Sequence, residues 1–380
     1  MSQEPFGDIP LFREIQRLLS SSEGPINLEI ARQVGTAVGS QAGEEPPRDQ
    51  VAERSFAAVV ARSEQLLAGY TLLPVEEPAR TGALTRTQWI ASTLDGWLWL
   101  LEHLSARLSA ELAKLGPEAE AGNPLSAAMG QIGPLLLGIQ AGTLVGHLSL
   151  EALGRYDLPI PRADDGRLFF LPANLDSLAR QNGLEAEDLR LWLALRDVSR
   201  RLPLNSAPWP ERYLKSQLTE LVDSVELDMA SIERRLMDLQ SNGMDMLEAG
   251  MGAEDTLPIV PTERHRRALD RLRAFVALLD GYSRHATSAV SGEILTAPDR
   301  LADVMRQRAG APSPGERMLA QILGLDLDRT LEASGATFAA VVVKLKGLPA
   351  LNRVWEAPDN LPSIDEIRDP FAWMERVLGA

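Results

Sequence analysis

The segment LWLALRDVSRR, residues 191–201, decides how the rest of the chain is interpreted. Its apolar side chains recur with the period of an α-helix, which predicts a buried stripe made of Leu191, Leu195, Val198 and Leu202. Arg196 and Arg200 stand four residues apart, so about 40° separates them around the helix axis. Leu193 lies on the same side as the two arginines. We therefore expect protein to cover part of the arginine face. Because an unpaired buried charge is costly, we also expect carboxylates to pair with the two arginines, and the candidates are Asp197, Asp280 and Glu220.

Further segments carry a resemblance that extends over nearly the whole chain. They are IPLFREIQRLLSSSEGPINLEIARQV, GRYDLPIP at 154–161, RLFFLPANLDSLA, DLRLWLALRDVSRR, SAPWPERYLKSQL, LLDGYSRHA and VWEAPDNLPSIDEIRDPFAW. Together they resemble the zincin-like metallopeptidase family (type 2), which is known mainly from actinobacteria and is labelled as associated with deazaflavin-coenzyme biosynthesis. The resemblance implies a zincin-like fold and, in intact relatives, a catalytic zinc ion.

The resemblance also places the catalytic positions on this sequence. Members of the family carry L-W-x-A-L-H-E-V-T-H-R where this chain has LWLALRDVSRR. The first histidine ligand therefore corresponds to Arg196, the catalytic glutamate to Asp197 and the second histidine to Arg200. Asp280 stands where relatives have the glutamate of an E-G motif, the preferred position of the third metal ligand. The H-E-x-x-H motif is thus lost.

These replacements change what the helix can do chemically. A zinc ligand must offer a lone pair, and a guanidinium group offers none while it adds a positive charge. Asp197 keeps a carboxylate, but without a zinc-bound water it has no proton to remove. The sequence therefore predicts no cofactor and a catalytically inactive homologue of the metallopeptidases. Taken without the resemblance, RDVSRR is typical of a solvated charged helix face.

Three functions remain open for such a chain. The favoured one is a remodelled cleft in which Arg196, Arg200 and His285 bind a peptide or another anionic partner. The alternative is a hydrolase or metallopeptidase with a non-standard site near Asp280 and His285. The third is a structural or regulatory partner of an active relative.

The four histidines are His103, His147, His265 and His285, and no two of them have the three- or four-residue spacing of a helical metal pair.

Composition limits the partners and the compartment. A formal charge of −15 argues against nucleic acid and anionic membranes, because both are bound by clustered basic charge. The chain has no cysteine, and MSQEPFGDIP lacks the basic and apolar pattern of a secretory signal, so we expect a cytoplasmic protein. The run from Gly133 to Gly154 contains polar residues, which favours a buried helix over a membrane span. No motif indicates the substrate or the oligomeric state.

The predicted fold is mainly α, with a zincin-like core, a small β-sheet and many surrounding helices. Arg167–Pro172 (RLFFLP) is the expected strand. The resemblance to the zincins implies that this strand lies beside the 186–201 helix, where it could pair with an extended substrate. Long helical runs are expected at 89–115 and 212–240, and a glycine-rich loop or lid at 241–255. We expect an N-terminal helical region (1–130), the core with the degenerate motif helix (131–300) and a C-terminal helical region packed on it (301–380), or else one continuous domain.

Overall fold

The computed structural model describes residues 24–43, 45, 50–112, 124–164, 166–228, 231, 260, 262–292, 294–323 and 329–379. The loop or lid expected at 241–255 lies outside these residues. The helix expected at 212–240 ends at Asp223, residues 224–228 that follow it are not helical, and most of the remaining stretch lies outside the described residues.

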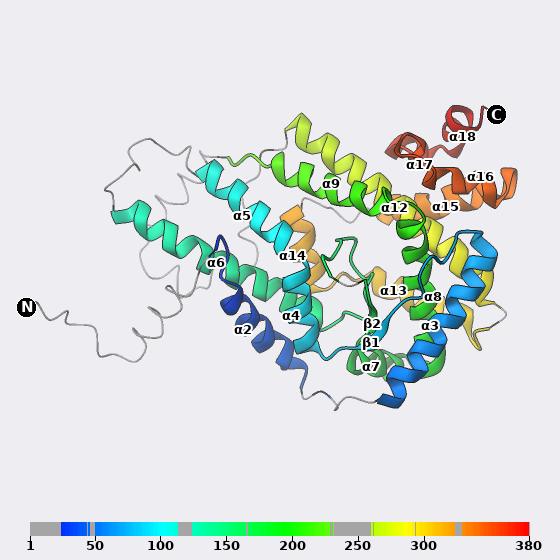
Figure 1. Cartoon of the computed structure of the whole chain (residues 1–380), viewed down its shortest axis with the longest axis horizontal. Coiled ribbons are helices and arrows are strands. Elements are labelled where there is room, and N and C mark those ends of the chain that lie inside the picture. Colours follow the sequence, from blue (N-terminus) through cyan, green and yellow to red (C-terminus); the bar gives the residue numbers. More distant parts are fainter. Residues whose placement is uncertain are drawn as a thin grey trace, which may run out of the picture.

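Helices dominate the described chain, so the predicted mainly α fold is confirmed (Figure 1). In the first part these are α2 (Leu28–Gly39), η1 (Ser40–Ala42), α3 (Gln50–Thr71), α4 (Arg86–Gly96), α5 (Leu98–Leu112), α6 (Pro124–Ser149), α7 (Pro172–Asn182), α8 (Ala186–Asn205) and α9 (Pro210–Asp223). In the second part these are α12 (Glu263–Ser291), α13 (Pro298–Ala309), α14 (Pro314–Leu323), α15 (Arg329–Lys346), α16 (Leu348–Asn352), η4 (Arg353–Trp355), η5 (Pro358–Asn360), α17 (Ile364–Arg368) and α18 (Pro370–Leu378).

The expected strand forms as β2 (Leu168–Phe170), which pairs in parallel with β1 (Thr81–Ala83). On its other side, Phe170 forms an antiparallel bridge with Gly154. The backbone N–H of Leu171 also donates to the carbonyl of Leu153, at 3.0 Å. Both edges of the strand are therefore occupied at Phe170, so an extended substrate could not pair with the strand there.

The glycine-rich run expected to form a buried helix is the second half of α6, which packs against α2 (Figure 1). A Cβ atom placed on Gly146 would lie 2.7 Å from Cβ of Val38 and 2.8 Å from the carbonyl oxygen of Gly35. Such distances are too short for real atoms, so the glycines are what allows the two backbones to approach. None of the described helices is long and apolar enough to cross a membrane.

The motif helix α8 packs against α3, α7, α9 and α12. Helix α12 continues the contact outward to α15, and α15 packs on α16, α17 and α18. The helical run expected at 89–115 is divided into α4 and α5 at Trp97. One hydrophobic cluster extends from Ile26 to Met374. The expected boundaries near 130 and 300 fall inside α6 and α13, and the three-part division stays a prediction.

Candidate functional site

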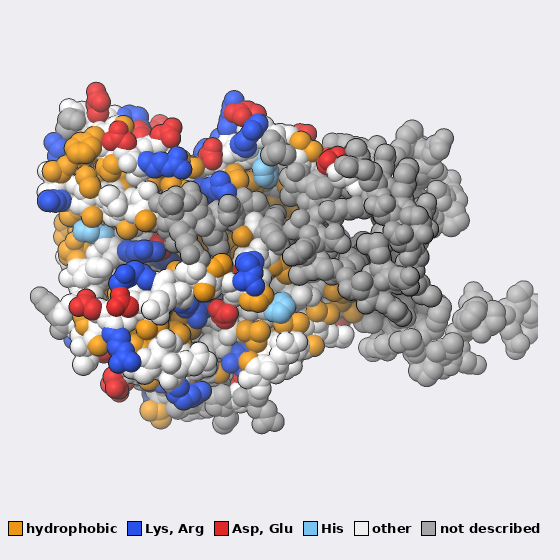
Figure 2. Space-filling model, turned by 180° about the vertical axis from the view of Figure 1, so that it is seen from behind, with side chains coloured by type: hydrophobic (Ala, Val, Ile, Leu, Met, Phe, Trp, Pro, Cys, Tyr) orange, Lys and Arg blue, Asp and Glu red, His pale blue; other side chains and the backbone are white. Residues whose placement is uncertain are grey.

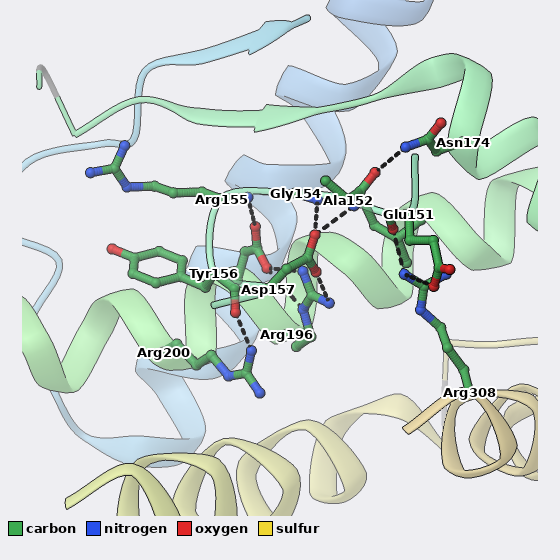
Figure 3. Close-up of polar contacts among 12 residues, drawn as sticks. Glu151, Ala152, Gly154, Arg155, Tyr156, Asp157, Asn174, Arg196, Arg200 and Arg308 are labelled. Carbon is green, nitrogen blue, oxygen red and sulfur yellow. Dashed lines mark hydrogen bonds and ion pairs between the residues drawn. The ribbon is translucent and has the colours of Figure 1, made fainter. Parts of the chain in front are cut away.

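The arginine face of α8 is partly covered by protein, as the sequence predicts. Leu193, Leu195 and Val198 are fully buried, whereas the side chains of Arg196 and Arg200 keep 13% and 18% of their surface exposed. The cover comes mainly from the segment 153–157, which connects the end of α6 to the region before β2 (Figure 3). The positions that correspond to the histidine ligands of the family therefore face a backbone segment.

Arg196 is held by two carboxylates. Its Nη1 atom lies 2.6 Å from Oδ1 of Asp157, and its Nε and Nη2 atoms donate to Oδ1 of Asp197 at 2.9 and 2.7 Å (Figure 3). The guanidinium carbon also lies 5.2 Å from the ring centre of Trp192. All three nitrogen atoms of this guanidinium are therefore engaged within the chain.

Asp157 fixes the covering segment to the motif helix. Its Oδ2 atom accepts the backbone N–H groups of Leu153 and Gly154, at 2.5 and 2.9 Å. Burial alone would raise the pKa of Asp157, but Arg196, Arg308 and these two N–H groups hold that pKa below its ordinary value. Asp157 is thus a charged group at neutral pH.

Asp197, at the position of the catalytic glutamate, is completely buried. Its Oδ2 atom accepts the backbone N–H of Arg155 at 2.9 Å, which ties the same segment to α8 a second time (Figure 3). Burial raises the pKa of Asp197, although Arg196 opposes that shift. A Cβ atom placed on Gly154 would lie 2.6 Å from Oδ2 of Asp197. Asp197 is therefore sealed by backbone and has no open space in front of its carboxylate.

Arg200 links α8 to α12. Its Nη2 atom pairs with Oδ1 of Asp280, and its Nη1 atom donates to the carbonyl oxygen of Tyr156. The other oxygen of Asp280 lies 3.1 Å from Nη2 of Arg284. Burial would raise the pKa of Asp280, but Arg200 and Arg284 hold it below its ordinary value. Arg200 and Asp280 stand at the positions that correspond to the family's second and third metal ligands. The structure brings these two side chains together as an ion pair.

His285, on α12, contacts α3 and not the arginine face of α8. Its Nε2 atom lies 2.8 Å from the hydroxyl oxygen of Tyr70 on α3, and burial lowers the pKa of the imidazole. Of the carboxylates expected to pair with the arginine face, Asp197 and Asp280 do so, whereas Glu220 pairs with Arg264 at 2.9 Å. The other described histidine contacts are those of His103 with Asp223 and of His265 with Ser224.

The geometry of this site can now be compared with known proteins. A family model described as zincin-like metallopeptidase matches residues 26–374. The chain belongs to the zincin-like metallopeptidase family. This zincin-like chain is also similar to a solved structure titled "Crystal structure of a putative hydrolase with a novel fold from Chloroflexus aurantiacus". The two are 25% identical with a TM-score of 0.68, over 92% of this chain and 98% of that one. No curated protein matches the chain.

Zinc does not fit the donor set that this zincin-like chain presents. Arg196 and Arg200 have no lone pair to give, and their charges repel a cation. In the part of the chain that the structure describes, no group of three His, Cys, Asp or Glu side chains is placed to hold a metal ion. Asp197 and Asp280 are instead committed to guanidinium groups. The arrangement holds α8 to α12 and to the segment 153–157 by charge.

Sequence reasoning missed two parts of the site. One is Asp157, whose segment was recognised only as part of the family resemblance. The other is a cluster of hydroxyl groups between α8 and α12, in which Oγ of Ser199 lies 2.5 Å from Oγ of Ser283 and 3.3 Å from Oγ1 of Thr287. Ser199 lies between the two arginines in the sequence, and a small polar residue on an otherwise apolar helix side was the available signal for a close helix contact.

Proposed function

We propose that this chain is a catalytically inactive member of the zincin-like metallopeptidase family, in which ion pairs hold the motif helix in place of a metal. The observation that carries the proposal is the pairing of Arg196 and Arg200 with Asp157, Asp197 and Asp280. A guanidinium that is already neutralised by carboxylates of its own chain neither binds zinc nor activates water.

The ion pairs have a structural consequence that supports this view. A metal held by α8 and by a residue at position 280 would join α8 to α12. The Arg200–Asp280 pair joins the same two helices, and Arg196–Asp157 adds a link from α8 to the segment 153–157. We infer that the replaced residues keep the framework of the site and remove its chemistry.

A peptide or anionic partner at Arg196, Arg200 and His285 remains part of the proposal. Because the two arginines are already paired, such a partner must compete with carboxylates of the chain. A more open place lies at the end of α8, where a cavity of about 540 Å³ is lined by charged residues of both signs. These are Glu76, Glu77, Arg201, Glu211, Arg212 and Lys215. Ligand-sized cavities commonly have volumes in the range of about 300–1,000 Å³.

We further propose a cytoplasmic protein that binds neither nucleic acid nor membrane. The supporting observations are the charge of −15 and the intermixing of described acidic and basic side chains on the face shown in Figure 2. The actinobacterial distribution and the association with deazaflavin-coenzyme biosynthesis stay predictions.

The competing proposal is a hydrolase with a non-standard site near Asp280 and His285. Its support is the similar structure from Chloroflexus aurantiacus, which is described as that of a "putative hydrolase". Against it stand the contacts of the two side chains, because Asp280 is held by Arg200 and Arg284 while His285 is held by Tyr70 on another helix. None of these contacts joins Asp280 to His285, either directly or through a common partner.

Elemental analysis tests the proposal directly. After purification without chelator and dialysis, the protein should contain far less than one zinc ion per chain, because both histidine positions hold guanidinium groups. The matched variant carries Arg196→His, Asp197→Glu and Arg200→His, with Asp280→Glu added to lengthen the third position. It should bind zinc, with nitrogen–metal distances of about 2.0–2.1 Å, and its Tm should rise with zinc.

Two results would contradict the proposal. Stoichiometric zinc in the native protein that Asp280→Ala or His285→Ala removes would establish the non-standard metal site. Peptidase activity of the native protein that is lost in those variants would contradict the proposal as well, because it would show catalysis that depends on Asp280 or His285.

A further inference from the structure

A small cavity lies beside the arginine site, between the junction of α4 with α5 and the segment 154–162. Its volume is about 10 Å³, measured as the space open to the centre of a water-sized sphere. This is roughly the space that a single water-sized species occupies. The residues that line it are Trp89, Trp97, Gly154, Arg155, Asp157, Leu158, Ile160 and Arg162. Asp157 lines this cavity and also pairs with Arg196, but nothing in the proposed function requires the cavity itself.

Three of the lining residues have a buried N–H group that makes no hydrogen bond. These groups are Nε1 of Trp89, Nε1 of Trp97 and Nε of Arg162. Their residues keep only 2%, 4% and 7% of their surface exposed. A buried donor that lacks an acceptor is costly, on the order of 1–3 kcal/mol, so three of them around one cavity require an explanation.

The guanidinium of Arg162 is short of negative charge. Its Nη2 atom donates to the hydroxyls of Thr93 and Ser92, at 2.8 and 3.2 Å, and these groups are neutral. Its carboxylate neighbour is Asp164, 3.4 Å from Nε, and Asp164 also pairs with Arg155 at 2.8 Å. Two guanidinium groups thus share one carboxylate at this end of the site.

Burial and the positive charge of Arg155 lower the pKa of Arg162 to about 10, although Asp164 opposes this. The charged form of Arg162 is therefore held at a free-energy cost that a further negative charge nearby would offset. The aromatic rings of Trp89 and Phe169, with centroids 5.7 and 5.0 Å from the guanidinium carbon, add no formal negative charge.

A water molecule does not suit this environment well. One water molecule accepts at most two hydrogen bonds, so it cannot satisfy all three donors, and its own O–H groups also seek acceptors. Asp157 carries the carboxylate among the lining side chains, and its two oxygens already accept from Arg196, Leu153 and Gly154. A monovalent anion the size of a halide needs no acceptors and can take hydrogen bonds from all three donors. The negative charge of Asp157 is countered locally by Arg196.

We propose that this cavity is a binding site for one halide-sized anion, held by the indole N–H groups of Trp89 and Trp97 and by Nε of Arg162. The anion completes the charge balance of the Arg155–Asp164–Arg162 group. Gly154, Arg155 and Asp157 also line the cavity and belong to the segment that covers the motif helix (Figure 3). The bound anion therefore stabilises that segment.

Thermal unfolding in different sodium salts tests the site. At equal ionic strength, Tm should be higher in sodium chloride or sodium bromide than in sodium gluconate, whose anion is too large for the cavity, by roughly 2 °C or more. The Trp97→Phe variant, which removes one donor and keeps an aromatic ring, should lose this difference. Trp355→Phe is the matched control, because Trp355 is also buried with an unpartnered indole N–H but lies outside the cavity.

Crystals of the unaltered protein grown or soaked in sodium bromide supply an independent readout. An anomalous bromide peak within hydrogen-bond distance of the two indole nitrogen atoms and Nε of Arg162 supports the site, whether or not the variants fold. A cavity that holds only water in those crystals, or a Tm that is equal in chloride and gluconate, overturns the proposal. A halide effect that persists in Trp97→Phe also overturns it.

Discussion

The ion pair between Arg200 and Asp280 makes a quantitative prediction about the stability of the arginine site. The side chains keep only 18% and 15% of their surface exposed, so each is largely removed from water. Replacing one member of such a pair leaves the other as an uncompensated charge, which is strongly destabilising. Replacing both with apolar side chains of similar size removes the charge and its partner together. A double-mutant cycle with Arg200→Met and Asp280→Leu separates these effects.

The two single variants should differ, because their remaining partners differ. Asp280→Leu leaves Arg200 with the carbonyl of Tyr156 alone and should lower the free energy of unfolding by about 3 kcal/mol. Arg200→Met leaves Asp280 paired with Arg284, whose side chain is 43% exposed, and should lower it by about 2 kcal/mol. The double variant should lie about 2 kcal/mol below the native protein, which corresponds to a coupling energy of about 3 kcal/mol.

The assay is urea unfolding followed by tryptophan fluorescence, with the free energies compared at a common urea concentration. The control cycle uses the exposed pair of Arg306 with Asp303, whose side chains are 70% and 58% exposed. Arg306→Met and Asp303→Leu should show a coupling energy of about 0.5 kcal/mol or less. If the Arg200–Asp280 cycle gives a value as small as this control, the ion pair does not hold α8 to α12.

Two further predictions concern the covering segment. Gly154→Ala should lower the free energy of unfolding by about 1–3 kcal/mol in the same assay, because its Cβ atom would lie 2.6 Å from Asp197 and 2.9 Å from Leu193. Gly292→Ala is the control and should have little effect, because a Cβ atom there meets no other atom within 4 Å. Equal effects of the two substitutions would contradict the close fit at Gly154. The lowered pKa of Asp157 means that its stabilising contribution is complete above the unfolded pKa of about 3.9 and is lost as pH falls through the lower folded value. Asp157→Asn should therefore be less stable than the native protein at pH 7, with the difference shrinking in strong acid; a difference that is constant from neutral to acid pH would refute the assignment.

The sequence was sufficient for the parts of the fold that depend on local patterns. The period of apolar residues in α8 placed Leu195 and Val198 in the core, and bulky residues between turn signals located β2. The burial of α6 also followed from its composition, because polar residues interrupt an otherwise apolar run. These features are local because each depends on the side chains of one segment.

The partners in the site could not be predicted in the same way. The pairing of Arg200 with Asp280 joins residues 80 positions apart. Asp157 precedes β2 in the sequence, whereas its partner Arg196 follows that strand. Which carboxylate faces which guanidinium depends on how α12 and the segment 153–157 pack on α8. Glu220 was an equally charged candidate, but α9 directs it toward Arg264. Long-range packing therefore decides the pairs that the residue types only permit.

The packing also explains why restoring the motif is a demanding test of the proposed function. Arg196→His and Arg200→His remove both links that hold α8, the one to Asp157 and the one to Asp280, before any metal is bound. Asp157 and Asp280 would then be buried carboxylates without their main cations, which is unfavourable. A bound zinc ion supplies two positive charges close to the place where two guanidinium charges were lost. The restored variant should therefore be markedly less stable than the native protein without zinc and should recover stability with it. Equal stability of the two proteins without zinc would mean that the ion pairs had not taken over the structural role of the metal.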